Sequence, residues 1–314
     1  MTTHGPIATR ADLGIRPGSF AAWVLAARPK TLPVAFAPVA VGTSVAYFAN
    51  GVSGWGAAVA ALLGALFLQI GTNFANDYFD ARSGADNEER IGPPRAVQSG
   101  LLSGRVMAIG TAVAFGMATL TGVYLTWLSG WPIVAIGAVS VLSGVAYTGG
   151  PYPLGYNGLG DLFVFVFFGL VATSGTAFVA SGSIPAATWL AGASAGALAT
   201  TVLVVNNVRD AKGDREVGKR TLVARFGRRF GELEYAALLG LAAASIALVP
   251  ILGLGPWPVL AALFPLALGV KNWRTLLSSR DGETLNQCLA DSAKVMLMSC
   301  LLMAAGFAVG KHVP

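Results

Sequence analysis

Charged side chains are scarce in this chain and unevenly spread. They make up 11% of the 314 residues, whereas 54% of the residues are hydrophobic. Soluble domains carry about 25% charged residues, and a soluble protein of this length would need far more polar side chains to cover its core. The composition therefore excludes an ordinary soluble protein and indicates a chain embedded in a lipid bilayer, with no nucleic acid as a partner.

Histidine and cysteine are almost absent, which removes several kinds of site. His4 and His312 stand at opposite ends of the chain, so a histidine-based triad or metal site is excluded. Cys288 and Cys300 are expected at different depths, which argues against a disulfide or a zinc site. The first residues lack the apolar core of a secretory signal. We expect a cytoplasmic tail at 1–30, followed by a single transmembrane domain at 31–314.

Four long stretches of the chain carry no formal charge, and a fifth is shorter. They hold 46, 55, 47, 36 and 16 residues and begin after Lys30, Arg105, Asp161, Glu234 and Lys294. A spanning helix needs about 20 apolar residues, so the first four can hold two spans each and the last holds one. The sequence therefore predicts nine transmembrane helices, at residues 32–49, 55–76, 106–128, 131–147, 159–181, 187–207, 235–253, 256–273 and 292–310.

The basic residues indicate how these spans are oriented. Twenty of the 21 lysines and arginines lie before the first span or in the connections at 77–105, 208–232 and 271–294, and only Lys311 lies on the other side. Cytoplasmic loops of membrane proteins carry an excess of Lys and Arg. We therefore expect the N-terminus and these connections in the cytoplasm and the C-terminus outside, in the plasma or inner membrane of the cell.

Two of the predicted spans end in similar clusters of asparagine and aspartate. The members of the two clusters are Asn73, Asn76, Asp77 and Asp80, and Asn206, Asn207, Asp210 and Asp214. In each cluster an Asn precedes an Asp by four residues, a spacing that places both side chains on one face of a helix. Four spans separate the clusters, so both are expected on the same side of the membrane.

The chemistry of these clusters favours a metal-dependent diphosphate site. Converging carboxylates repel one another unless a cation lies between them, and oxygen ligands suit Mg²⁺, which binds carboxylates together with water and substrate phosphates. Arg82, Arg209, Lys212 and Lys219 can donate to phosphate oxygens. Ordinary helix caps and cytoplasmic charges are the alternative explanation. Two matching clusters make that alternative weaker, because polar groups within a membrane are costly.

In these clusters the sequence resembles the UbiA superfamily of intramembrane aromatic prenyltransferases. The first motif of that superfamily, Asn-Asp-x-x-Asp-x-x-x-Asp, is similar to residues 76–80, although the third acid arrives late, at Asp86. The second motif, Asp-x-x-x-Asp followed by Gly and Thr, is similar to Asp210, Asp214, Gly218 and Thr221. The resemblance covers nearly the whole chain and implies an all-α bundle of nine transmembrane helices with cytoplasmic cap loops.

Further segments are similar to the branch of the superfamily that prenylates 1,4-dihydroxy-2-naphthoate. These segments are 28–31, 90–95, 98–100, 147–151, 158–161 and 218–222. The resemblance implies transfer of a polyprenyl chain from its diphosphate to this acceptor, with loss of carbon dioxide, to give demethylmenaquinol. It also implies Mg²⁺ held by the two acidic motifs, where its Lewis acidity helps the diphosphate to leave.

The clusters and the resemblance together assign expected roles to individual residues. The expected catalytic residues are Asn76, Asp77, Asp80, Asp210 and Asp214. The expected metal ligands are Asn76, Asp77, Asp80, Asp86, Asn206, Asp210 and Asp214. The expected substrate-binding residues are Lys30, Asn73, Arg82, Arg95, Tyr147, Asn206, Asn207, Lys212 and Lys219. Lys30 and Tyr147 can equally be interfacial anchors, and Asp161 is expected to cap the fifth span.

Other functions stay open on the sequence alone. A prenyltransferase could use 4-hydroxybenzoate, homogentisate or haem as its acceptor. A phosphatidyl-transferring enzyme is disfavoured because its Asp-Gly-x-x-Ala-Arg element is absent from the sequence. A transporter should carry polar groups near the centre of the bilayer, whereas these acids gather at one edge of it. Metal-dependent release of diphosphate from a prenyl donor would separate an enzyme from a transporter.

Overall fold

Helices form all the regular structure in residues 14–52, 54–84 and 92–312, the part of the chain that this computed structural model describes. In chain order they are α1 (Phe20–Ala27), η1 (Pro29–Thr31), α2 (Leu32–Asn50), α3 (Trp55–Ser83), α4 (Gly104–Ser129), α5 (Pro132–Ala146), η2 (Gly155–Asn157), α6 (Gly160–Phe165), η3 (Val166–Val171), α7 (Ala172–Ser181), α8 (Ala187–Glu216), α9 (Leu222–Phe226), α10 (Arg228–Ile251), η4 (Trp257–Leu263), α11 (Leu266–Ser278) and α12 (Gly282–Gly310). The prediction of an all-α protein is confirmed for these residues.

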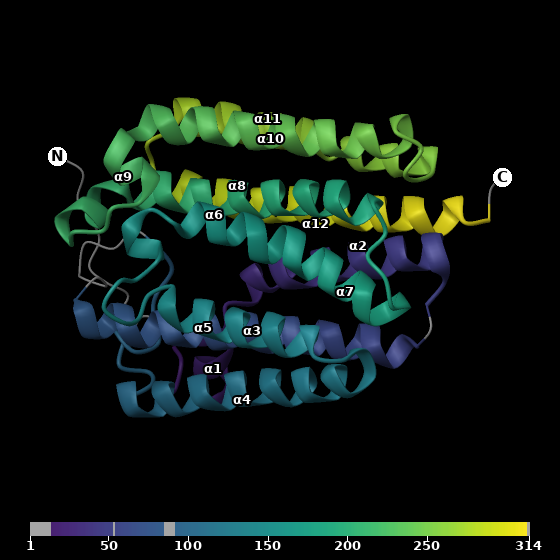
Figure 1. The fold of residues 1–314 in the computed structure, drawn as a ribbon. Coiled ribbons are helices and arrows are strands. Elements are labelled where there is room, and N and C mark those ends of the chain that lie inside the picture. The colour runs from purple at the N-terminus through teal and green to yellow at the C-terminus, as the bar shows by residue number, and fades with distance from the viewer. Residues whose placement is uncertain (1–13, 53, 85–91, 313–314) are drawn as a thin grey trace.

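The long helices run roughly parallel to one axis (Figure 1). α10 and α11 lie along one edge and α4 along the other, with α8 and α12 between them. α8 packs against α10, α12 and η3, and most of its residues are buried. We call the end that carries α9 the polar end, because α3 and α8 finish there with the two predicted clusters.

In the part of the chain that the structure describes, seven helical segments are long and apolar enough to cross a membrane, which makes the chain a multi-pass membrane protein. They cover the predicted spans except the fourth and the eighth. The fourth span corresponds to α5, which is apolar but has only 15 residues. The eighth is divided between the 3-10 helix η4 and the 13-residue helix α11. The length and hydropathy criteria therefore bear out seven of the nine predicted spans.

The predicted span at 159–181 is a continuous rod with a π-helical centre. α6, η3 and α7 follow one another without a break, and η3 is the π-helical part. This rod approaches α8 closely, because a Cβ atom added to Gly169 would lie 2.5 Å from the Cα atom of Gly196. Small residues allow such close approach between membrane helices. The spacing of Gly192 and Gly196 on α8 therefore explains how this helix can lie at the centre of the bundle.

Exposed tryptophans mark the end of the bundle opposite the polar end. Trp55 begins α3, Trp127 lies in the last turn of α4, and Trp131 precedes α5. Their side chains are largely exposed. Tryptophan is enriched where a membrane protein meets the interface between lipid and water. This end therefore has the composition of a membrane interface.

Candidate active site at the polar end of the bundle

Asp80, in the last turn of α3, joins three other segments at the polar end. Its side chain is only 3% exposed. One carboxylate oxygen lies 3.3 Å from a guanidinium nitrogen of Arg95. The other accepts a 2.6 Å hydrogen bond from the Tyr156 hydroxyl and lies 3.4 Å from Nζ of Lys219. This carboxylate therefore connects the first predicted cluster to the segments that follow α3, α5 and α8.

Lys219 reaches Asp80 because the chain turns sharply after α8. The backbone N–H of Lys219 donates to the carbonyl oxygen of Asp214 at 2.7 Å, and its ammonium group lies 4.5 Å from the centre of the Tyr156 ring. α8 itself continues to Glu216, so Asp214 lies one helical turn beyond Asp210, as the spacing predicted. Lys219, which follows the second cluster, therefore links the end of α8 to Asp80 of the first cluster.

Asp77 holds the segment that carries Arg95. Its carboxylate accepts hydrogen bonds from the backbone N–H groups of Ala96, at 2.9 Å, and Val97, at 3.2 Å. Asp77 is 1% exposed, and a buried carboxylate needs hydrogen-bond partners of this kind. The geometry thus gives Asp77 a positioning role toward the guanidinium group that faces Asp80.

Asn76 faces the segment that follows α5. Its side-chain oxygen accepts a 2.7 Å hydrogen bond from the Thr148 hydroxyl, just as Asp80 accepts one from Tyr156 in the same segment. Residues 76 and 80 therefore point the same way, which confirms the face that their spacing predicted. Thr148 and Tyr156 together fasten this segment to the end of α3.

Arg209 organises the second cluster. It is 5% exposed and makes two hydrogen bonds to the Asp210 carboxylate, at 2.7 and 2.6 Å. It also donates to the side-chain oxygens of Asn206 and of Asn286, each at 2.7 Å. Paired contacts of this kind fix a guanidinium group in orientation as well as position. Asn286 belongs to α12, so the last helix of the bundle helps to hold the second cluster.

Asn207 contacts a buried acid rather than the rest of its cluster. Its amide donates to the carboxylate of Asp161 at 3.3 Å, and Asp161 is 5% exposed. The interpretation of Asp161 as a helix cap is wrong, because Leu159 is the N-cap of α6 and Asp161 lies within the first turn. A carboxylate there still suits the positive end of the helix dipole.

The remaining predicted residues lie around this centre. Lys30 and Arg82 are exposed, and Arg82 donates to the Tyr78 hydroxyl at 3.1 Å. The Lys212 side chain is 78% exposed and lies 3.8 Å from Glu216. The predicted ligand Asp86 lies outside the described residues. None of these three basic side chains makes a contact with Asp80 or Asp210 that would place it in the centre of the site.

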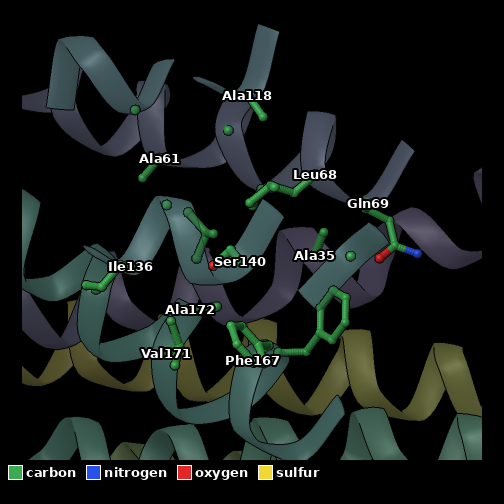
Figure 2. Close-up of a pocket in the computed structure, with 18 of the residues that line it drawn as sticks. Ala35, Ala61, Leu68, Gln69, Ala118, Ile136, Ser140, Phe167, Val171 and Ala172 are labelled. Atoms are coloured by element: carbon green, nitrogen blue, oxygen red, sulfur yellow. The ribbon is translucent and has the colours of Figure 1, made fainter. Parts of the chain in front are cut away.

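An elongated cavity runs through the bundle below the polar end. Its volume is about 210 Å³, and its walls come from helices α2 to α5 and from the continuous segment formed by α6, η3 and α7. Figure 2 shows that many wall side chains are short or aliphatic, among them Ala35, Ala61, Ala118 and Ala172. Tyr147 lines the cavity, and a Cβ atom added to Gly160 would lie 2.9 Å from its hydroxyl oxygen. The Tyr147 hydroxyl therefore lies beside the first turn of α6, between the cavity and Asp161.

The acids of the site are paired with basic side chains, and within the described ranges no three His, Cys, Asp or Glu side chains form a metal-binding group by themselves. Asp80 contacts Arg95 and Lys219, and Asp210 contacts Arg209. The donors are nonetheless oxygen atoms of carboxylates and amides, the type that Mg²⁺ prefers. An anion such as diphosphate would attract the same basic side chains and thereby expose these carboxylates to a divalent cation.

Sequence reasoning missed Tyr156, Thr148 and Asn286. Tyr156 and Thr148 lie in a connection without helical periodicity. Thr148 falls within the segment 147–151 that carries part of the resemblance, but no role was assigned to it. Asn286 lies before the predicted last span, so the sequence places it in a loop, whereas α12 begins at Gly282. The amide and hydroxyl groups close to predicted span ends were a further signal.

Comparison with known proteins agrees with this geometry. Residues 35–308 match the UbiA prenyltransferase family. The chain is 37% identical to the 1,4-dihydroxy-2-naphthoate octaprenyltransferase of Mycobacterium tuberculosis, over 93% of this chain and 99% of that protein. It is 34% identical to the protein of the same name from Escherichia coli, over 91% of this chain and 94% of that protein.

Solved structures share the fold at lower identity. A UbiA homolog from Aeropyrum pernix aligns with a TM-score of 0.66 at 18% identity, over 89% of this chain and 97% of that chain. A UbiA homolog from Archaeoglobus fulgidus, bound to GPP and Mg²⁺, aligns with a TM-score of 0.63 at 15% identity, over 90% of this chain and 99% of that chain. These likenesses show the arrangement of helices.

Proposed function

Because this chain belongs to the UbiA prenyltransferase family, we propose that it transfers a polyprenyl chain from its diphosphate to 1,4-dihydroxy-2-naphthoate. The prenyl group takes the place of the ring carboxylate, which leaves as carbon dioxide, and the product is demethylmenaquinol. The names of relatives at 33–37% identity support this acceptor. The observation that carries the reaction type is the contact between Lys219 and Asp80, which joins the two acidic clusters beside an apolar cavity.

The diphosphate of the donor binds at the polar end. Arg95, Lys219 and Arg209 are basic groups that already face the two clusters, and guanidinium and ammonium groups bind phosphate oxygens well. When these groups turn from the carboxylates to the diphosphate, Asp80 and Asp210 become available to a cation. The exposed Lys30, Arg82 and Lys212 attract the anionic head at the rim.

Mg²⁺ is the cation that the oxygen donors of this site suit best. The residues that would hold it are Asp80, Asp210, Asp214, Asn76 and Asn206. Of the other two predicted ligands, Asp77 holds backbone N–H groups and Asp86 lies outside the described residues. Bound there, the metal would supply Lewis-acid assistance to the departure of diphosphate. That the UbiA homolog from Archaeoglobus fulgidus was solved with GPP and Mg²⁺ bound supports a divalent cation in this site.

The cavity takes the apolar part of the donor. Its walls are mostly aliphatic or aromatic. Burying the prenyl carbons there stabilises the bound donor by about 0.8 kcal/mol for each methylene group. The cavity is also a dry setting for the allylic cation that departure of diphosphate leaves, which protects it from water. Tyr147 lies where the cavity meets the polar end, and the face of its ring can stabilise that cation.

The identity of the acceptor is tested by incubating the purified protein with one prenyl diphosphate and several aromatic acids. The masses of the products are then measured by mass spectrometry. We expect a product from dihydroxynaphthoate that has lost the mass of carbon dioxide relative to simple addition. If 4-hydroxybenzoate were the only acid that gave a product, the acceptor of this protein would not be dihydroxynaphthoate. Binding of these molecules with no release of diphosphate would instead favour a transporter.

The membrane topology belongs to the same proposal. We propose nine spans, with α5 and the segment from η4 to α11 crossing the membrane beside the seven longer segments. The N-terminus and the polar end lie in the cytoplasm, in a single domain at 31–314 that follows a tail at 1–30. The bias of Lys and Arg toward this end supports the orientation.

A further inference from the structure

Gln69 is a buried polar residue in the wall of the cavity. The reaction described so far gives this residue no role. It lies on α3, is 8% exposed, and lines the cavity. Its side-chain oxygen has no hydrogen-bond partner among the residues that the structure describes. An unpaired polar atom at membrane depth is costly. The oxygen therefore points to a partner that enters the cavity.

The orientation of the Gln69 amide is fixed by its neighbours. Its nitrogen lies 3.3 Å from the Thr31 hydroxyl oxygen and 3.5 Å from the side-chain oxygen of Asn73. The Thr31 hydroxyl donates its own hydrogen to the carbonyl oxygen of Arg28 at 2.9 Å, so toward the amide it can only accept. A flipped Gln69 amide would place its oxygen opposite two acceptors, and the network excludes that arrangement.

Asn73 is held in the same direction. Its nitrogen donates to the carbonyl oxygen of Ala27 at 2.9 Å and to the Thr31 hydroxyl at 3.1 Å, which uses both of its hydrogens and leaves its oxygen toward Gln69. The carbonyl groups of Ala27 and Arg28 are presented by the turn at Arg28, whose φ of 52° lies in the left-handed region. This turn therefore fixes Gln69 through Thr31 and Asn73.

The Gln69 oxygen consequently faces the cavity. Figure 2 shows the oxygen on the side of the other wall residues and the nitrogen on the far side. Along α3, Gln69 lies seven residues before Asn76, which is about 10 Å of helix. A group bound by Gln69 therefore lies beside the polar end and below the diphosphate, where an acceptor ring must meet the reacting carbon.

We propose that the side-chain oxygen of Gln69 accepts a hydrogen bond from a ring hydroxyl of the aromatic acceptor. This inference rests on the proposed function. The hydroxyl is the one at ring position 4, because the hydroxyl at position 1 adjoins the carboxylate and donates to it within the molecule. Gln69 thus selects a ring with a hydroxyl para to the first one, a feature that aliphatic wall residues do not recognise.

The experiment compares wild-type protein with Gln69→Met, which keeps the size of the side chain and removes its acceptor oxygen. In the variant we expect the KM for dihydroxynaphthoate to rise about tenfold, the effect of losing one hydrogen bond to an otherwise unpaired group. The KM for the prenyl diphosphate stays the same. A second ligand, 1-hydroxy-2-naphthoate, lacks the hydroxyl at position 4, and as a competitive inhibitor it should bind both proteins equally.

One further variant separates this role from the general effect of removing a buried polar group. Ser299→Ala is the matched control, because the Ser299 hydroxyl is also buried without a described partner but lies on α12 away from the cavity wall. Its KM for the acceptor should equal that of the wild type.

The outcomes are distinct. If wild-type protein turns over dihydroxynaphthoate and the Met variant keeps the wild-type preference for the diol, the inference is wrong and the proposed function stands. A rise of the same size in the KM for dihydroxynaphthoate in Ser299→Ala would also contradict an acceptor role for the Gln69 oxygen. If the wild type forms no product from dihydroxynaphthoate, the proposed function itself fails.

Discussion

The residues of the polar end are arranged as pairs of opposite charge. Asp80 and Asp210 each contact a basic side chain that is itself largely buried. Removing one partner from such a pair leaves an unbalanced charge and is costly. We expect a bound diphosphate and its cation to replace these contacts. The acids then stabilise the fold before the donor binds and hold the cation after it binds.

The charge of Asp80 and Asp210 can be tested with substitutions that preserve shape. Asp80→Asn and Asp210→Asn should each lower turnover about a hundredfold or more, the usual cost of removing a group that stabilises developing charge. The double variant should lose little more than either single one, because residues that act as a unit are not additive. Steady-state rates of the four proteins in detergent give the comparison.

A matched control comes from the same end of the bundle. Asp281 caps α12 through the backbone N–H and the hydroxyl of Thr284, both at 2.8 Å, and these bonds lower the pKa of its carboxyl. Asn caps a helix about as well as Asp, so Asp281→Asn should keep wild-type turnover. Near-normal turnover of Asp80→Asn or Asp210→Asn would contradict a shared metal site.

At the scale of elements, the cavity depends on glycine and on the π-helical segment η3. Phe163 and Phe167 stack with ring centres 5.7 Å apart and both line the cavity. π-helical turns inside α-helices are often found at functional sites. On the opposite wall, α5 contributes Gly137, beside which a Cβ atom would meet no other atom within 4 Å. The space there is open to a prenyl chain.

A side chain at Gly137 should therefore compete with long donors. Displacing two chain carbons from the wall costs about 1.6 kcal/mol, so Gly137→Leu should lower kcat/KM about tenfold for an octaprenyl donor. A geranyl donor, with only two isoprene units, should lose less. Gly116→Leu on α4 is the control, since that position also has open space but does not line the cavity. If Gly137→Leu lowered kcat/KM equally for both donors, the prenyl chain would not lie along this wall of the cavity.

At the scale of the whole molecule, the sequence predicted much of the fold because its signals are local. Runs without charge mark the spans, and the spacing of Asn76 and Asp80 correctly predicted a shared face. The contacts of Asp80 could not be predicted, because Tyr156 and Lys219 are separated from it by 76 and 139 residues. The π-helical segment η3 was also not predicted, because no local pattern in the sequence marks it; in the structure it packs against α8.

Orientation is the topological prediction that can be measured on whole cells. Both native cysteines are buried, so single introduced cysteines should dominate labelling. Gly213→Cys at the polar end should be shielded from an impermeant external reagent, whereas Ala186→Cys at the start of α8 should react. The reverse pattern would invert the orientation, and reaction at both positions would contradict the span count.

The central claim is that two acidic clusters form one Mg²⁺-dependent site for transfer to dihydroxynaphthoate. Its most direct test is the rate at which the purified protein forms decarboxylated prenyl product, measured with EDTA and then with Mg²⁺ restored. We predict that product formation stops with EDTA and returns with Mg²⁺, with one diphosphate released for each product molecule. Full turnover without a divalent cation, or a product that keeps its carboxylate, would contradict this claim.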